Sequence, residues 1–341
     1  MAPPTKSARA MITNAYLVEQ MQRLELSNRE ALPHFKTVRS SAITASQGIV
    51  ICHVRDEMEL LPHFLKHYRE IGVKRFAFVD NGSVDQTLPF LLDQNDCDVF
   101  QFTGSFKNSR AGMIWKNLLL LTYLPAKWYF SADVDEHAVY EGWPGTGLDE
   151  FANRMSIKGR SAVTALMVDM YSGGPIAKAH VDPTASLFET CPFFDGDGYQ
   201  IEMPENWRES DFPRLSAHGG PVARVFGRKG RLGWLAKTPL ILEPNIYFQD
   251  PHTVFPIGLN LMPMEIALLH FRFTAQLTQK VAHVLERRGH SEESIDCYQK
   301  LSIKMKQDPE FGFSYSGSVK FQTPQQFIDR SMIGPNSVAR L

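Results

Sequence analysis

Residues 127–137 read Lys-Trp-Tyr-Phe-Ser-Ala-Asp-Val-Asp-Glu-His. The run opens with aromatic and apolar residues, typical of a buried strand, and closes with three carboxylates within four residues. On an extended backbone alternate side chains share a face, so Asp133 and Asp135 are predicted to point the same way. Two ionised carboxylates about 6 Å apart repel each other by roughly 3 kcal/mol at an effective dielectric constant of ~20. The pattern favours a cation at this position, although a solvated acidic turn would have the same sequence.

The cation best suited to such a pair is a hard divalent ion. Mg²⁺ and Mn²⁺ take carboxylate oxygens as ligands and commonly share their coordination with the phosphates of a substrate. We therefore interpret Asp133 and Asp135 as a clamp that holds Mn²⁺ or Mg²⁺ against a diphosphate.

Upstream of this stretch, strands alternate with helices. Strands are predicted at residues 48–54, 74–79, 98–102 and 127–132, with helices at 57–71, at 109–121 and in a segment that ends near 92. This alternation predicts a parallel sheet covered by helices on both faces. In such sheets ligands bind beyond the carboxyl ends of the strands, where Asp56, Asp80 and Asp133 are all expected.

Composition limits the class of protein. The 341 residues are 43% hydrophobic and 21% charged, with a formal net charge of -1, which is ordinary for a large α/β domain with an annex. A nearly neutral chain argues against a nucleic-acid partner, because phosphate binding needs a basic face. The four cysteines form no Cys-x-x-Cys pair, which suggests a reducing compartment. Without a signal peptide or a run near the ~18 apolar residues of a membrane span, we expect a cytoplasmic protein with no transmembrane segment.

Several nucleotide-binding and hydrolytic motifs are missing from the sequence. The first predicted strand is not followed by Gly-x-Gly-x-x-Gly, and there is no Gly-x-x-x-x-Gly-Lys-Ser/Thr loop, His-Glu-x-x-His or Gly-x-Ser-x-Gly. Because no glycine-rich loop is available to cradle an anion, a bound diphosphate is expected to be neutralised by the metal.

Residues 48–137 resemble the nucleotide-binding half of a family 2-type glycosyltransferase with the GT-A fold. The likeness rests on three motifs in order: Arg55-Asp56-Glu57, the segment Val-Asp-Asn-Gly-Ser-Val-Asp-Gln-Thr at 79–87, and Asp133-Val134-Asp135-Glu136. Residues 109–117 also resemble the segment that these enzymes place before the metal motif. The region at residues 175–235, together with the later Lys237-Thr238-Pro239-Leu240, resembles a bacterial subgroup of these transferases.

The resemblance implies donor-binding roles for Asp56, Asp80, Asp85 and Arg110. Asp80 would contact the nucleotide base, Asp85 would shape its pocket, and Arg110 would lie near the diphosphate. Each role has a structural alternative: a turn at Asp80, a helix cap at Asp85 and an exposed first-turn residue at Arg110.

Transferases of this type often complete the metal site with a C-terminal histidine, and imidazole suits Mn²⁺. The resemblance implies that His252 or His270 joins Asp133 and Asp135 as a metal ligand. His270 matches the closing His-aromatic motif in position, and His252 matches a histidine at the end of the preceding strand. A histidine that binds no metal is the alternative at both positions.

An inverting transfer needs a general base that deprotonates the acceptor hydroxyl, and a carboxylate suits this role. Asp169, which follows a predicted strand at 161–168, and Asp195 are the candidates. Asp195 is slightly favoured because its short Asp-Gly-Asp turn could reach the cleft from the irregular insert at 175–235, which is typical of a binding loop. A turn-stabilising aspartate is the alternative for each.

Together these features predict an α/β fold with a GT-A-like, doubly covered, mainly parallel sheet, an irregular acceptor-side insert and C-terminal helices. The predicted parts are a helical appendage at 1–45, a nucleotide-sugar-binding half at 46–140, an acceptor-side half at 141–272, and helices with a tail at 273–341.

The predicted function is metal-dependent, inverting transfer of a sugar from a nucleoside-diphosphate sugar to a hydroxyl of a glycan or lipid-linked acceptor. A lipid-linked acceptor would bring the protein into peripheral contact with a membrane. A sugar nucleotidyltransferase, which would want a glycine-rich loop after the first strand, and a catalytically inert nucleotide- or sugar-binding module are the alternatives.

Overall fold

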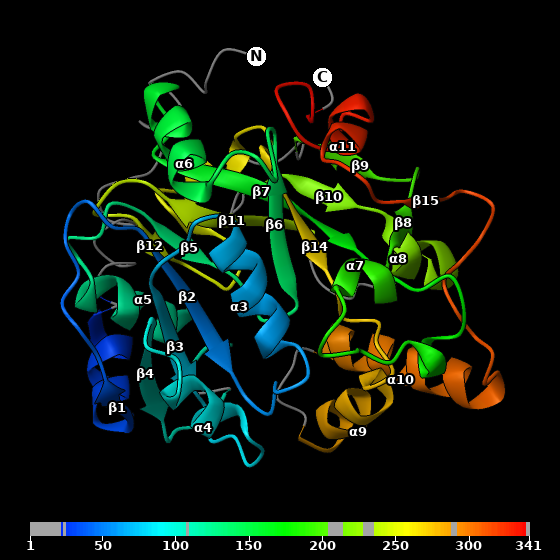
Figure 1. The fold of residues 1–341 in the computed structure, drawn as a ribbon, viewed down its shortest axis with the longest axis horizontal. Helices are drawn as coiled ribbons and strands as arrows, with labels where there is room; N and C mark the ends of the chain where they lie inside the picture. The colour runs from blue at the N-terminus through cyan, green and yellow to red at the C-terminus, as the bar shows by residue number, and fades with distance from the viewer. Residues whose placement is uncertain are drawn as a thin grey trace.

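A central sheet organises the chain. The computed structural model describes residue 22 and residues 25–106, 109–203, 214–227, 235–287 and 292–338. The strands of this sheet are β1 (Phe35–Arg39), β2 (Ile49–Val54), β3 (Phe76–Asp80), β4 (Cys97–Phe102), β5 (Tyr129–Ser131), β6 (Glu136–Tyr140), β7 (Ala162–Asp169), β11 (Ala236–Ile241) and β14 (Ile266–His270). They are arranged in the order β1-β4-β3-β2-β5-β11-β7-β14-β6 (Figure 1).

Most strands of the sheet point in one direction. β2, β3, β4 and β5 are parallel, β11 is antiparallel to both β5 and β7, and β7 is parallel to β14. β1, β6 and β11 therefore run opposite to the other strands. The carboxyl ends of β2, β3, β5, β7 and β14 meet at one edge, and β6 and β11 begin there. This mainly parallel α/β sheet confirms the predicted fold class.

Helices cover both faces of the sheet, as predicted. The helices of the N-terminal half are α3 (Leu61–Glu70), α4 (Thr87–Leu92), α5 (Met113–Thr122) and α6 (Leu148–Ile157). Val50 and Cys52 of β2 belong to the core that contains the apolar residues of α3, whereas Ile49 and Ile51 belong to the core that contains those of α5. The alternation along β2 shows that successive side chains enter opposite cores, which explains its continuous apolar sequence.

Shorter strands and further helices build the rest of the molecule. They are η1 (Leu32–His34), η2 (Ile176–Lys178), α7 (Leu187–Thr190), β8 (Phe193–Asp195), β9 (Gln200–Glu202), β10 (Ser216–His218), α8 (Gly220–Phe226), β12 (Tyr247–Phe248), β13 (Val254–Phe255), η3 (Ile257–Leu261), α9 (Leu277–Arg287), α10 (Glu292–Gln307), β15 (Ser318–Lys320) and α11 (Gln325–Asp329). The pairs β9–β10, β12–β13 and β8–β15 form two-stranded ribbons. Figure 1 shows α9 and α10 side by side, in orange, and the two helices contribute to a separate apolar core.

Three local predictions differ from the structure. Residues 35–39, expected in the helical appendage at 1–45, form β1 at the edge of the sheet. Residues 25–31 of the appendage are helical, and residues 1–21 lie outside the described residues. The acidic stretch is not extended, because Val134 and Asp135 lie in a turn. Asp195 is not in a turn but is the last residue of β8.

Within the described ranges, no helix combines the length and apolar character needed to cross a membrane.

Candidate active site

The site forms where the strands end. β14 lies between β6 and β7, and its last residue, His270, is in register with Glu136 of β6 and with Asp169 of β7. Asp133 and Asp135 lie between the end of β5 and the start of β6. Side chains that are far apart in sequence are thus brought to one edge of the sheet by strand direction alone.

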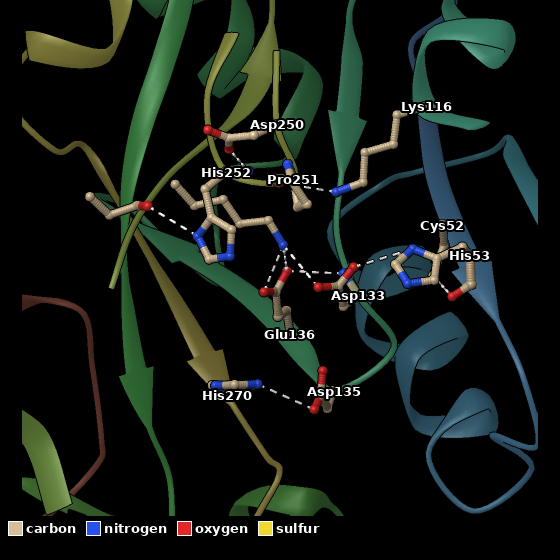
Figure 2. A network of polar contacts seen from close by, with 12 residues as sticks. Cys52, His53, Lys116, Asp133, Asp135, Glu136, Asp250, Pro251, His252 and His270 are labelled. Atoms are coloured by element: carbon tan, nitrogen blue, oxygen red, sulfur yellow. Dashed lines mark hydrogen bonds and ion pairs between the residues drawn. The ribbon is translucent and has the colours of Figure 1, made fainter. Parts of the chain in front are cut away.

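A tight turn separates the two aspartates of the acidic stretch. The Glu136 backbone N–H donates to the Asp133 carbonyl at 2.9 Å, and the Asp133 backbone N–H donates to the Glu136 carboxylate at 2.9 Å. Figure 2 shows the result, with Asp133 facing His53 and Asp135 facing His270. The prediction that both side chains point the same way is wrong because the backbone turns between them.

Asp135 and His270 form a pair across the strand ends. Asp135 Oδ2 lies 3.2 Å from His270 Nε2. Burial disfavours the charged forms of both groups, but each stabilises the other's charge. The pKa of Asp135 falls to about 2. The pKa of His270 rises to about 9. At neutral pH the structure without metal therefore holds a carboxylate against an imidazolium, and a metal bound by Asp135 and His270 would take the place of the proton on His270 Nε2.

Asp169 holds the other side of the His270 ring. Its Oδ1 lies 3.0 Å from His270 Nδ1, and its Oδ2 accepts a hydrogen bond from Arg272 at 2.7 Å. Burial by itself would raise the pKa of Asp169, but the charges and hydrogen bonds of Arg272 and His270 together outweigh burial and lower this pKa. Asp169 is 2% exposed and uses both oxygens on neighbouring side chains, so it orients His270.

Asp133 has a different set of partners. Its Oδ2 accepts a hydrogen bond from Lys237 Nζ at 3.1 Å, and its Oδ1 lies 3.6 Å from His53 Nδ1. Burial would raise the pKa of Asp133, but the charges of Lys237 and Lys116 outweigh burial and keep this pKa well below its ordinary value. Asp133 Oδ1 is buried and makes no hydrogen bond to any described residue.

Lys237 also binds Glu136. Its Nζ donates to both Glu136 oxygens at 2.7 Å, and its side chain is 2% exposed. Burial would lower the pKa of Lys237, but the charges of Asp133 and Glu136 raise it well above the ordinary value. Lys237 is therefore a permanent cation built into the acidic end of β5.

These residues fit a divalent cation at Asp135 and His270. No group of three or more histidine, cysteine, aspartate or glutamate side chains is arranged as a complete metal site in the part of the chain that is described. However, a metal-binding histidine commonly donates its second ring N–H to a carboxylate, as His270 can to Asp169. Mg²⁺ and Mn²⁺ bound to substrate phosphates need only one or two protein ligands. Asp133 has a free oxygen for a further contact.

His252 lies elsewhere in the network. Its Nδ1 is 3.2 Å from the Ala236 carbonyl. Burial, reinforced by the positive charge of Lys237, lowers the pKa of His252 to about 4. A metal ion bound at His252 would be repelled by the nearby ammonium group of Lys237. Of the two predicted histidines, the structure brings His270 to Asp135 and leaves His252 beside Lys237.

The predicted base-binding residue Asp80 is fully buried at the end of β3. Its carboxylate accepts hydrogen bonds from the backbone N–H groups of Gly82 and Ser83, both at 3.2 Å. This is the turn that the sequence allows as the structural alternative. Contact of Asp80 with a nucleotide base stays a prediction.

Asp56 and Asp85 join the loops after β2 and β3. Asp56 Oδ1 accepts from the Val84 N–H at 2.7 Å, and Asp85 Oδ2 accepts from the Met58 N–H at 3.3 Å. The Asp56 backbone has a φ of 55°, in the left-handed region. These contacts fix the two strand-end loops against each other, and a role in donor binding stays a prediction for both residues.

Arg110 is exposed on the segment that leads into α5. It has a φ of 51°, followed by Ala111 at 55° and Gly112 at 86°. Left-handed backbone costs a residue with a side chain roughly 1–2 kcal/mol, and such strain is concentrated at functional sites. The strain supports a functional role for this segment, while contact between Arg110 and a diphosphate stays a prediction.

Asp195, the favoured general base, has no free oxygen in this structure. It is 2% exposed. Oδ1 accepts from the Tyr171 hydroxyl at 2.7 Å and from Arg224 Nη2 at 3.0 Å, and Oδ2 accepts from Arg224 Nε at 2.8 Å. The geometry therefore argues against Asp195 as the base, and the same argument holds for Asp169. Both roles stay predictions that the contacts do not support.

The sequence interpretation gave no role to three residues of the network. Lys237 and Lys116 are both nearly fully buried, and His53 faces Asp133. The signal for Lys237 is a charged residue at the start of an apolar strand, and for Lys116 it is a lysine within the apolar stretch that forms α5. A lysine in such a context requires a partner, because an uncompensated buried charge is costly.

No protein-family model matches the chain, and no curated protein matches it significantly. Among solved structures, HddC from Yersinia pseudotuberculosis is 8% identical, with a TM-score of 0.29, over 83% of this chain and 97% of its own. A 4-diphosphocytidyl-2C-methyl-D-erythritol synthase is 13% identical, with a TM-score of 0.29, over 83% and 97%. An apo UDP-glucose pyrophosphorylase is 9% identical, with a TM-score of 0.30, over 75% and 99%. Likenesses at TM-scores this low carry no argument about the activity of this chain.

Proposed function

We propose that this chain is a metal-dependent glycosyltransferase that moves a sugar from a nucleoside-diphosphate sugar to an acceptor hydroxyl, with inversion. The observation that carries the proposal is the 3.2 Å approach of Asp135 to His270 at the shared strand ends, with Asp169 behind the histidine. This arrangement supplies an anionic and an imidazole ligand where ligands of parallel sheets bind.

The residues of the chain have separate tasks in this proposal. Asp135 and His270 would hold Mn²⁺ or Mg²⁺, which supplies charge neutralisation for the leaving diphosphate. Asp169 fixes the orientation of the His270 ring, and Lys237 fixes Asp133 and Glu136. Preorganised charges of this kind stabilise developing charge without reorganising during the reaction.

We further propose that residues 46–140 bind the donor and residues 141–272 shape the acceptor side, in a cytoplasmic protein. The acceptor would be a glycan or a lipid-linked sugar that reaches the sheet edge from the insert. The C-terminal part at 273–341 supports the donor half through α9, because Lys280 binds Glu57 at 2.7 Å.

Sugar nucleotidyltransfer is the second candidate. We keep it because such an enzyme would also use a metal ion and a nucleotide at the carboxyl ends of a similar sheet. Against it, the segment after β2 is not a free glycine-rich loop but is bonded to the next loop, with the Asp56 and Glu57 N–H groups donating to Ser83 and Thr87. The experiment must therefore distinguish glycosyl transfer from nucleotidyl transfer.

The test is a panel of nucleoside-diphosphate sugars incubated with Mn²⁺, with release of nucleoside diphosphate as the readout. A glycosyltransferase releases UDP or GDP from its donor, by transfer or by slow hydrolysis, and loses this activity in EDTA. A nucleotidyltransferase instead produces a nucleoside triphosphate when inorganic pyrophosphate is supplied with the same sugars.

A matched variant completes the test. Asp135→Asn should abolish release of nucleoside diphosphate in a protein that still folds, with a melting temperature lowered by loss of the ion pair with His270. Stabilisation of the wild type by UDP or GDP without any turnover across the panel would identify an inert binding module and refute the proposed transfer.

A further inference from the structure

Most cations at this edge of the sheet are paired with carboxylates of the protein. Lys237 binds Asp133 and Glu136, as described above. Arg272 binds Asp169 at 2.7 Å, and Lys280 binds Glu57 at 2.7 Å. These pairs compensate the cost of removing charges from water.

Lys116 is the exception among these cations. Its side chain is as inaccessible as a core residue, at 4% exposure, yet no described carboxylate lies within ion-pair distance of its Nζ. That atom donates one hydrogen bond, of 3.2 Å, to the Pro251 carbonyl and lies 5.4 Å from the centre of the Phe248 ring. An ammonium group has three donors, so two remain for another acceptor.

The surroundings of Lys116 are rigid. The neighbouring Asn117 exchanges two hydrogen bonds of 2.8 Å with the backbone of Phe248, which ties α5 to β12. Asp250 accepts from the N–H groups of His252 and Thr253 at 2.7 and 2.9 Å, and these contacts fix the turn that carries the Pro251 carbonyl. Lys116 is therefore held in place before any ligand binds.

Lys116 also lies close to the acidic end of β5. The two side chains form no ion pair, since the ion-pair partners of Asp133 are Lys237 and His53. Figure 2 shows Lys116 reaching from α5 toward Pro251 and the edge where Asp133 lies. An anionic ligand bound between Lys116 and the Asp135–His270 pair would supply the negatively charged partner that Lys116 lacks among the described residues.

We propose that Lys116 Nζ binds an oxygen of the donor's diphosphate. The bound ligand would thus form the ion pair that Lys116 does not form with any described carboxylate. The inference rests on the proposed function, because the diphosphate is that of the donor. In this arrangement two positive groups would neutralise the charge of the leaving diphosphate. They are a divalent ion at Asp135 and His270, and the ammonium group of Lys116.

The test measures the affinity for inorganic pyrophosphate, and then for UDP and GDP, by calorimetry in EDTA, so that no metal contributes. Lys116→Met keeps an unbranched side chain, one atom shorter, and removes the charge. Loss of a hydrogen bond to a charged group should weaken pyrophosphate binding about 10- to 100-fold. Lys158→Met is the control, since Lys158 is 50% exposed and precedes the start of β7, at the end of that strand away from Asp169. The pyrophosphate affinity of this variant should match that of the wild type.

Folding provides the second readout. Removing a buried charge that has no carboxylate partner should leave the melting temperature equal or higher, whereas a structural lysine would lower it. Unchanged pyrophosphate affinity in folded Lys116→Met, a lower melting temperature, or no binding by the wild type would each overturn the inference. A wild type that binds pyrophosphate but turns over no sugar nucleotide would instead overturn the proposed function alone.

Discussion

Lys237 Nζ lies 2.7 Å from both carboxylate oxygens of Glu136, although Lys237 is 2% exposed and Glu136 is fully buried. Removing one partner of a buried ion pair leaves an uncompensated charge. Lys237→Met should therefore lower the free energy of unfolding by about 3–5 kcal/mol, measured by urea denaturation. The double variant Lys237→Met/Glu136→Gln should recover much of this loss, and equal destabilisation in both variants would show that the ion pair is not the cause.

The architecture could be predicted from the sequence because it depends on local patterns. Continuous apolar runs identify strands buried on both faces, and β2 and β3 have that pattern. A helix between them follows from the apolar stripe of α3 and from Gly72, which ends it with a φ of 85°. These signals lie within a few residues of one another, so no long-range information is needed.

The site could be predicted only in part, because its contacts are long-range. His270 was one of two histidine candidates, and only the register of β14 with β7 shows that it meets Asp169. The partners of Asp133 and Glu136 could not be foreseen, because Lys237 lies a hundred residues later and reaches them through the antiparallel β11. The turn after β5 cannot be predicted from the sequence, because alternating acidic residues also fit a strand that continues.

Asp169→Asn should weaken Mn²⁺ binding without removing a metal ligand. A carboxylate that orients a metal-binding histidine typically contributes 10- to 100-fold to metal affinity, so a loss of about that size is expected in calorimetric titrations. Asp195→Asn is the matched control, because Asp195 is equally buried and paired with an arginine but does not contact His270. Equal Mn²⁺ affinity in Asp169→Asn and the wild type would remove Asp169 from the metal site.

Acid should destabilise the protein partly through His67 and His137. The rings stack with centroids 4.4 Å apart, and neither nitrogen of His137 has a hydrogen-bond partner among the described residues. Burial lowers the pKa of His67 from 6.5 to about 4 and places the pKa of His137 well below its ordinary value, with the charge of His67 adding to the effect.

In the unfolded chain these histidines therefore become protonated below pH 6.5, whereas His67 of the folded chain becomes protonated only at about pH 4. Stability should fall as the pH drops from 7 to 5, by up to about 2 kcal/mol for each such histidine. His137→Leu should show a smaller loss over the same range in urea denaturation at several pH values. Identical pH dependence in the variant and the wild type would refute this account.

Asp195→Asn distinguishes a catalytic base from a structural carboxylate. Loss of a general base typically lowers turnover by 10²- to 10⁴-fold, whereas the contacts of Asp195 with Tyr171 and Arg224 predict a structural effect.

The Asp195→Asn variant should have a lower melting temperature, because Arg224 loses its ionised partner. At temperatures where it is folded, its kcat for release of nucleoside diphosphate should stay within about tenfold of the wild type, a smaller effect than removal of a general base produces. A folded Asp195→Asn with kcat reduced a thousandfold would restore Asp195 as the base, because misplacement of a structural contact typically costs no more than about 100-fold.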